Sequence, residues 1–184
     1  MNFLKILMFV IMMIFFACNN QTQTQKKCYS RDTARCILLY AFDEPCFDES
    51  NECDNYYRMI YQPSFDSAVV ISIFPLDIQK AKVRIKYILT NELREDRLLK
   101  NYAEGKKGKY TVAEKEIIMP YVDTLRQMLT HTFFRQTEQE EWLDPSRYQI
   151  EMNQDGRFYS VWYNNPTEPN FLNVAAYFRK IAAN

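Results

Sequence analysis

The sequence predicts an α+β domain: an antiparallel sheet of four to five strands with two to three helices on one face, preceded by a disulfide-stapled segment. Three observations support this fold class. Short β-branched or alternating segments occur in adjacent pairs, amphipathic helical segments follow them, and four cysteines precede the first pair. The chain has 184 residues, of which 47% are hydrophobic, so it can bury one core. Helices with one apolar stripe pack against a sheet face to complete it.

The strands expected in the N-terminal half lie at 36–42, 67–74 and 82–89. The first ("CILLYAF") is a short apolar run, and the second ("SAVVISIF") is a β-branched run that Pro75 ends. The third ("KVRIKYIL") alternates apolar with charged residues, which is the pattern of a strand buried on one face only. The second and third segments are expected to pair as an antiparallel hairpin. The alternating residues of the third are Val83, Ile85 and Tyr87 against Arg84 and Lys86.

Two helices are expected next. The first spans 91–104, with Asn91 as its N-cap and Gly105 at the position where a C-terminal glycine belongs. The stretch 111–114 ("TVAE") has the spacing of a capping box, in which the Thr and Glu side chains bond free backbone N–H groups. It is therefore expected to open a second helix that continues through residue 133. Pro120 should kink or split that helix, because proline removes an internal hydrogen bond.

The C-terminal third predicts a hairpin and a helix. Segments 148–152 and 158–163 flank "NQDG", and Asp155-Gly156 is a strong two-residue turn because both positions tolerate positive φ. Glu151 alternates with Gln149 and Asn153, so it is expected on the polar exterior of its strand. The helix expected over 170–183 is amphipathic, and one face carries Phe171, Val174, Ala175, Phe178, Ile181 and Ala182.

The N-terminus carries an export signal. Twelve apolar residues, 6–17, follow Lys5; they are too few to span a bilayer but fit the h-region of a signal peptide. The stretch Phe15-Phe16-Ala17-Cys18 resembles the lipobox of a bacterial lipoprotein precursor, with Phe15 where that family usually has Leu. The resemblance implies that Cys18 becomes the first mature residue and carries acyl chains such as palmitate. A signal peptide that is cut elsewhere and an uncleaved short anchor are the alternatives.

The same resemblance implies a localisation. Residue 19 is Asn, not the Asp that often retains such lipoproteins at the inner membrane, so the outer membrane is favoured, with the periplasmic or surface leaflet open. The polar residues that follow predict a flexible tether. The expected organisation is a signal peptide at 1–17, a lipidated cysteine and tether at 18–27, a cysteine-rich stapled segment at 28–66 and an α+β domain at 67–184.

The remaining cysteines predict two disulfides. Cys28, Cys36, Cys46 and Cys53 lie within 26 residues, and in an oxidising compartment such a cluster is typical of a disulfide staple. Three connectivities are possible, and short loops favour sequential pairing of Cys28 with Cys36 and of Cys46 with Cys53. A zinc site is the alternative. The spacings of seven, nine and six residues lack the short ligand pairs that structural zinc sites use.

The sequence carries no signature of catalysis or of nucleic-acid binding. Motifs of serine hydrolases, zinc proteases and nucleotide-binding loops are absent, so no catalytic residue, metal or cofactor is expected. The formal net charge is zero and no basic stripe occurs, which excludes nucleic acid as a partner. A small envelope hydrolase is the alternative function; it would use His131 or the carboxylates around Trp142, namely Glu138, Glu140, Glu141 and Asp144.

Aromatic residues are the compositional excess, with 13 Phe, 13 Tyr and 2 Trp. Tyr and Trp are favoured at interfaces, and the stretches at 54–61 ("DNYYRMIY") and 158–163 ("FYSVWY") concentrate them. The second stretch is either buried on both faces or presents one face to a partner. The sequence thus favours a lipid-anchored envelope binding or accessory protein, of inhibitor or immunity type, with a protein or glycan partner; a structural subunit is a further alternative. Candidate binding residues are Tyr56, Tyr57, Trp142 and Trp162.

Overall fold

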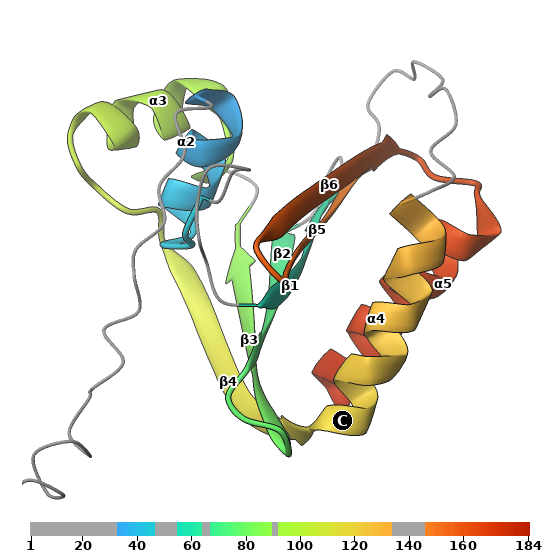
Figure 1. Ribbon diagram of the computed structural model, residues 1–184. Helices are drawn as coiled ribbons and strands as arrows, with labels where there is room; N and C mark the ends of the chain where they lie inside the picture. Colours follow the sequence, from blue (N-terminus) through green and yellow to red (C-terminus); the bar gives the residue numbers. More distant parts are fainter. Residues whose placement is uncertain (1–32, 47–54, 64–66, 90–91, 134–145) are drawn as a thin grey trace, which may run out of the picture.

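The computed structural model describes residues 33–46, 55–63, 67–89, 92–133 and 146–184 (Figure 1). Within these ranges the chain forms an α+β fold with a six-stranded antiparallel sheet and four helices. The predicted fold class is thus confirmed, with more strands than expected. The elements in chain order are α2 (Thr33–Ala41), β1 (Tyr56–Gln62), β2 (Ala68–Pro75), β3 (Lys80–Ile88), α3 (Glu95–Ala103), β4 (Tyr110–Ile118), α4 (Met119–Phe133), β5 (Arg147–Gln154), β6 (Arg157–Asn164) and α5 (Pro169–Ala183).

The strand order in the sheet is β4-β3-β2-β1-β5-β6. The first four strands form a meander, and the chain then passes through α4 to the other side of β1, where β5 pairs with β1 from Tyr56↔Asn153 to Gln62↔Arg147. As a result β1 lies near the middle of the sheet, while β4 and β6 are its two edges. The cysteine-rich segment therefore contributes a central strand of the sheet.

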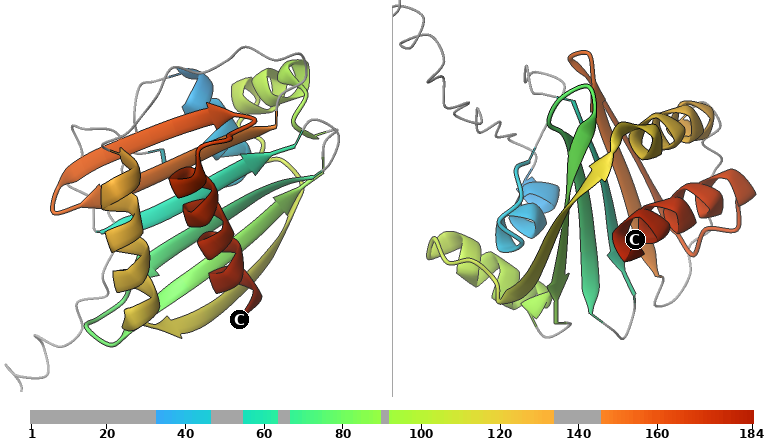
Figure 2. Two further views of the ribbon diagram at one scale, coloured as in Figure 1. Left: turned by 90° about the vertical axis from the view of Figure 1, so that its right-hand side faces the viewer. Right: turned by 90° about the horizontal axis from the view of Figure 1, so that it is seen from below.

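One face of the sheet is covered by α4 and α5, which lie side by side (Figure 2). The core between this face and the helices contains 20 buried residues. Every strand of the sheet except β4 contributes to it, and apolar burial of this kind is the main stabilising term in folding. The helix residues with the least exposure include Leu125, Leu129, Phe171 and Phe178, each 0% exposed.

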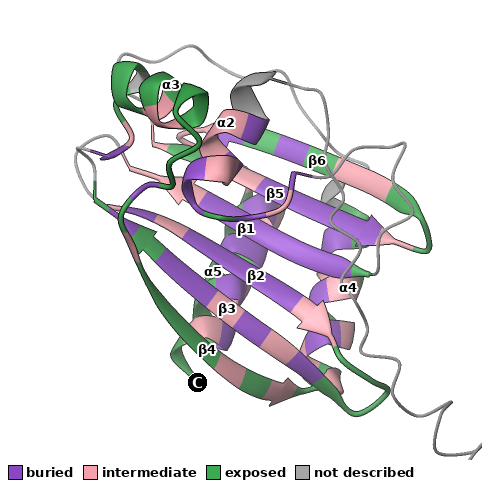
Figure 3. Ribbon diagram, turned by 90° about the vertical axis from the view of Figure 1, so that its left-hand side faces the viewer, coloured by how far each residue is buried: buried purple, intermediate pink, exposed green. Residues whose placement is uncertain are grey.

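The other face is covered by α2 and the turn that follows it (Figure 3). Cys36, Leu39 and Phe42 pack there on Ile60 and Val70, and α3 packs on α2. The prediction that all helices lie on one face is therefore wrong. The N-terminal segment supplies a second, smaller layer on the face opposite α4 and α5. Sequence periodicity predicts a strand there instead of a covering helix.

Residues 36–41 lie in helix α2 and Phe42 lies in the turn after it, so the predicted strand is wrong. A short apolar run fits a buried helix as well as a buried strand. Here the buried positions Cys36, Leu39 and Phe42 recur at a spacing of three, which places them on one side of a helix.

The stretch 111–114 lies inside strand β4, so the predicted capping box is also wrong. The helix α4 begins at Met119, and Pro120 lies in its first turn, where the missing N–H costs nothing. Pro120 therefore starts the helix instead of kinking it. The preceding helix, α3, begins at Glu95 with Arg94 as N-cap, and the proposed cap Asn91 lies outside the described residues.

Several predictions are confirmed. Strands β2 and β3 pair from Ala68↔Ile88 to Pro75↔Ala81. The β5–β6 turn has positive φ at Asp155 (52°) and Gly156 (75°), as the two-residue hairpin requires. Gly105, with φ of 67°, follows the C-cap of α3. Helix α5 buries the predicted face, at Phe171, Val174, Ala175, Phe178 and Ile181.

Candidate functional site

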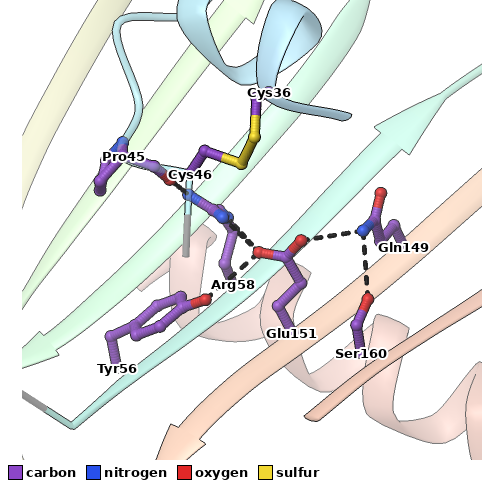
Figure 4. The surroundings of a disulfide bond; sticks show 8 residues. All are labelled: Cys36, Pro45, Cys46, Tyr56, Arg58, Gln149, Glu151 and Ser160. Carbon is purple, nitrogen blue, oxygen red and sulfur yellow. Dashed lines mark hydrogen bonds and ion pairs between the residues drawn. A yellow bond between two sulfur atoms is a disulfide. The ribbon is translucent and has the colours of Figure 1, made fainter. Parts of the chain in front are cut away.

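A network of buried charges lies between the sheet and the segment 42–46. Its centre is Arg58 of β1, which is 0% exposed and which the register places between Ser72 of β2 and Glu151 of β5. The Arg58 Nε donates to Glu151 Oε2 at 2.9 Å, and its Nη2 forms a close contact with the same oxygen. The Arg58 Nη1 donates to the backbone carbonyl of Pro45 at 2.7 Å (Figure 4).

A second ion pair extends the network toward β3. The Glu44 Oε1 lies 2.9 Å from Lys86 Nζ, and Glu44 Oε2 accepts a hydrogen bond from Ser72 Oγ at 2.9 Å. Glu44 Oε2 also lies 3.7 Å from Arg58 Nη1. Lys86 in turn donates to the carbonyls of Phe42 and Asp43. Two cations and two carboxylates therefore balance each other in a buried site.

The disulfide positions the groups that complete this network. Cys36 of α2 is bonded to Cys46, and Glu44 and Pro45 lie just before Cys46. Burial acts to lower the pKa of Arg58, but the negative charge of Glu151, together with Tyr56 and Glu44, outweighs it and raises the pKa. Arg58 therefore stays charged, and the network fastens the segment 42–46 to the sheet.

The edge strand β6 lies on the outer side of this network. On the face that it shares with α2, β6 presents Phe158, Ser160 and Trp162, which we call the β6 surface. Ser160 is exposed and Trp162 is 53% exposed, whereas Val161 and Tyr163 on the opposite face are buried in the main core. The strand thus has one face buried in the main core and one face on which Ser160 and Trp162 are exposed while Phe158 is half-buried against Tyr56.

The β6 surface is connected to the charge network through one side chain. The Gln149 Nε2 donates to Glu151 Oε1 at 2.8 Å and to Ser160 Oγ at 3.1 Å, and Gln149 is the register partner of Trp162. A continuous path of polar contacts therefore runs from Ser160 through Glu151 and Arg58 to the disulfide segment. The β6 surface is supported by groups that are themselves fixed.

The other edge strand has a different character. On β4, Glu114 pairs with Lys82 at 2.7 Å and with Arg84 at 2.7 Å, and Glu116 pairs with Lys80 at 2.9 Å. Charged side chains along an edge strand discourage pairing with another chain. In β6, by contrast, the seven residues from Phe158 to Asn164 carry no charge.

The structure separates the four predicted binding residues. Tyr56 and Tyr57 lie in β1 and are 1% and 2% exposed, so the structure does not present them as binding residues at the surface. The Tyr56 hydroxyl instead lies 3.3 Å from Glu151 Oε2. Trp162 lies on the β6 surface, and Trp142 is outside the described residues.

The cysteine prediction is corrected in its pairing. Cys36 is bonded to Cys46, so the sequential pairing of Cys36 with Cys28 and of Cys46 with Cys53 is wrong. The turn after α2 brings Cys46 back to the helix, with a Cα–Cα distance of 5.2 Å, which is within the ordinary range for a disulfide. Cys18, Cys28 and Cys53 lie outside the described residues.

The residues considered for hydrolysis are not brought together in the described structure. His131 is exposed near the end of α4, and Glu138, Glu140, Glu141 and Asp144 lie outside the described ranges. Among the residues whose placement is known, no group of three potential metal ligands occurs. The same part of the chain holds no helix with the length and apolar character needed to cross a bilayer.

The charge network was missed by sequence reasoning. Strand alternation predicts Glu151 on a polar exterior and Lys86 on the solvated side of its strand, yet they are 0% and 3% exposed. The alternation was identified correctly, but the cover supplied by 42–46 could not be inferred from it. The signal available was Arg58 within an otherwise apolar and aromatic run, since a buried cation needs a partner. No family model, curated protein or solved structure matches this chain.

Proposed function

We propose that this protein is a lipid-anchored binding or accessory protein of the cell envelope and that it binds a protein partner along β6. The observation that carries the proposal is an edge strand that has no charged residue from 158 to 164 and has exposed residues on one face. Trp162 is 53% exposed there, while the neighbouring Val161 is buried on the other face. The lipid anchor at Cys18 rests on the lipobox resemblance.

An edge strand offers two kinds of contact. Its outer backbone N–H and C=O groups can pair with an added strand, which gives affinity, and alternate side chains give specificity. In the described sheet β6 pairs only with β5, and its alternate side chains on the β6 surface are Phe158, Ser160 and Trp162. Tryptophan is among the residues that most often dominate binding energy. A protein segment in extended conformation fits both features.

The support beneath β6 favours tight recognition. Ser160 is held by Gln149, which is held by Glu151, and Glu151 is fixed by Arg58. A surface that is ordered before binding loses less conformational entropy when a partner arrives. The network therefore has a role in this proposal: it keeps the β6 surface in one arrangement.

The test uses the full-length, lipidated protein cross-linked in its native envelope and purified through a C-terminal tag. Ser160→Lys places a charge on the edge, and Trp162→Ala removes the aromatic group. Thr111→Lys is the matched control, because Thr111 is an exposed residue of the opposite edge strand β4. Positions 111, 160 and 162 are all exposed, so each variant should fold, and a cooperative thermal transition checks this.

We expect a stoichiometric protein partner with the wild-type chain and with Thr111→Lys, and its loss with Ser160→Lys and Trp162→Ala. A partner retained equally by all four proteins would place the interface elsewhere. Recovery of glycan instead of protein, again dependent on Trp162, would replace the protein partner by a carbohydrate. The intact mass of the same sample reports whether Cys18 carries acyl chains.

A further inference from the structure

The turn between β2 and β3 presents aliphatic side chains at one end of the sheet. Leu76 is 51% exposed and Ile78 is 91% exposed, and Ile118 of β4, the register partner of Lys80 at the base of the turn, is 57% exposed. We call these three residues the hairpin tip. Figure 1 shows the turn at the end of the sheet away from α2 and α3. Neither the main core nor the second layer includes any of the three.

The hairpin tip is a fixed structure. Asp77 Oδ1 accepts from the backbone N–H groups of Gln79 at 2.6 Å and Lys80 at 2.8 Å. The Leu76 N–H donates to the Lys80 carbonyl at 2.9 Å, and the Met119 N–H donates to the Gln79 carbonyl at 2.9 Å. These bonds satisfy polar backbone groups within the turn itself. They would remain made if the turn left water, which is what an apolar phase demands of a backbone.

We propose that the hairpin tip rests in the interfacial layer of the lipid bilayer to which the chain is anchored. The composition of the tip favours lipid over a protein pocket. Its exposed side chains are Leu and Ile, whereas protein-binding hot spots are enriched in Trp, Tyr and Arg and are poor in Leu. An aliphatic side chain enters the acyl region favourably without any directional partner.

Charges in the turn and behind it limit the depth of the tip. Lys80 pairs with Glu116, and Lys82 with Glu114, on the two strands that lead away from the tip. Asp77 stays ionised, because hydrogen bonds from the Gln79 and Lys80 amides lower its pKa. Such groups belong at the level of the headgroups. The tip is therefore placed at the interface and not across the hydrocarbon.

The anchor can reach the bilayer in this orientation. Nine residues separate Cys18 from Cys28, where the expected tether ends, and an extended chain of that length spans at most about 32 Å. Strand β3 has nine residues and is about 30 Å long, so the tether can pass from the α2 end of the sheet to the tip end. Tethering also raises the effective concentration of the tip at the membrane.

This inference rests on the anchor of the proposed function but not on its β6 surface, and one experiment separates them. A photo-crosslinking amino acid is placed at position 78 in the full-length chain in its native envelope, and in separate samples at Leu89 or Leu172, which are 62% and 40% exposed. Adducts are identified by mass spectrometry, and the intact mass reports lipidation at Cys18. Binding of the β6 partner is scored in the same samples.

We expect lipid adducts at position 78 in several-fold excess over positions 89 and 172, with the β6 partner retained. A protein adduct at position 78 would assign the tip to a protein contact. Reaction with water alone, in a chain that is shown to be acylated, would leave the tip in solvent. Either result overturns the proposal and leaves the β6 interface unaffected. An unacylated chain would remove the anchor from both proposals, and the mass spectrum would show it.

Discussion

The two faces of the sheet are held by different forces. The face under α4 and α5 is covered mainly by apolar side chains, in a cluster of 20 buried residues. The face under α2 combines a cluster of eight residues with four buried charges and a disulfide. Apolar burial is non-directional and tolerates adjustment, whereas a buried ion pair needs each partner in place. A small layer can thus be fixed by few contacts, but it is sensitive to the loss of any one of them.

The sharpest way to break the charged face is Glu151→Gln. This variant keeps the shape of the side chain but removes the charge that faces Arg58, and both groups are 0% exposed. Removing one partner of a buried ion pair leaves an uncompensated charge and costs about 3–5 kcal/mol. We expect a loss of that size in the free energy of unfolding, measured by urea denaturation without reductant.

The matched control is Glu116→Gln on β4. Glu116 pairs with Lys80, and both side chains are more than half exposed, so its loss should cost less than about 1 kcal/mol. The double variant Arg58→Met, Glu151→Met should regain much of the stability that Glu151→Gln loses, because two apolar groups leave no buried charge between them. Equal effects of Glu151→Gln and Glu116→Gln would show that the buried charges do not hold this face.

On the face covered by α4 and α5, the comparable test removes side-chain volume instead of charge. Leu125 of α4 is 0% exposed in the main core, and Leu125→Ala removes buried methyl groups and leaves a cavity. We expect a loss of about 3 kcal/mol in the free energy of unfolding. In contrast to the ion pair, Leu125→Met should cost less than about 1.5 kcal/mol. A loss with Leu125→Met as large as that with Leu125→Ala would contradict the view that this face adapts to shape.

Removing the disulfide between Cys36 and Cys46 would show how far the second layer depends on a covalent bond. Its half-cystines are 10 residues apart, and closing a loop of that size stabilises a fold by about 3 kcal/mol. Replacing Cys36 and Cys46 by Ala should lower the free energy of unfolding by that amount or somewhat less. Hydrogen exchange should show lost protection in α2 and unchanged protection in α4 and α5.

Peptide mapping without reduction provides the control for this variant. It should recover the Cys36–Cys46 pair in the wild-type chain. If two disulfides form, as the sequence predicts, the second pair recovered should be Cys28 with Cys53. Exchange that increases equally in α4, α5 and α2 would mean that the two faces unfold as one unit and that the disulfide does not serve the second layer in particular.

The two faces also differ in how far the sequence predicts them. The apolar face follows from periodicity, because Phe171, Val174 and Phe178 recur at helical spacing and Asp155-Gly156 marks the hairpin. The second face depends on contacts between residues distant in sequence. Arg58 and Glu151 are 93 residues apart in the sequence. The alternation of each strand places its charged residue on one face of the sheet, but it does not indicate that the two residues are partners or that this face is covered.

The misassigned elements have the same cause. The residues 36–42 are apolar enough for a strand or a helix, and the bond between Cys36 and Cys46 favours the helix that brings the two cysteines together. In β4, the stretch 111–114 satisfies a local capping rule, but pairing with β3 from Tyr110 to Ile118 outweighs it. Of the candidate site, exposed Trp162 was predictable as one of two alternatives, whereas the support from Gln149 and Glu151 required the strand register.

The smallest expected effect concerns Asp43, Lys107 and Tyr40, which we call the rim of the second layer. Asp43 lies 3.2 Å from Lys107 Nζ, and Lys107 Nζ lies 3.4 Å from the centre of the Tyr40 ring. Partial burial acts to raise the pKa of Asp43, but the hydrogen bond and charge of Lys107, with contributions from Lys86 and Tyr110, lower it. A lowered folded-state pKa adds stability above the ordinary pKa of the carboxyl group, and that stability is lost as the pH falls through the folded-state pKa.

We therefore expect Lys107→Gln to move the pKa of Asp43 toward its ordinary value, measured by the carboxyl chemical shift in an NMR titration. Lys106→Gln is the control, because Lys106 pairs with Glu104. The stability difference between Lys107→Gln and wild type should be small at neutral pH and should vanish once the pH has fallen through the lowered folded-state pKa of Asp43, where the carboxyl group is protonated in both chains. A difference that persists below that pH would assign the role of Lys107 to its contact with Tyr40. In that case the rim, like the apolar face, would be held mainly by packing.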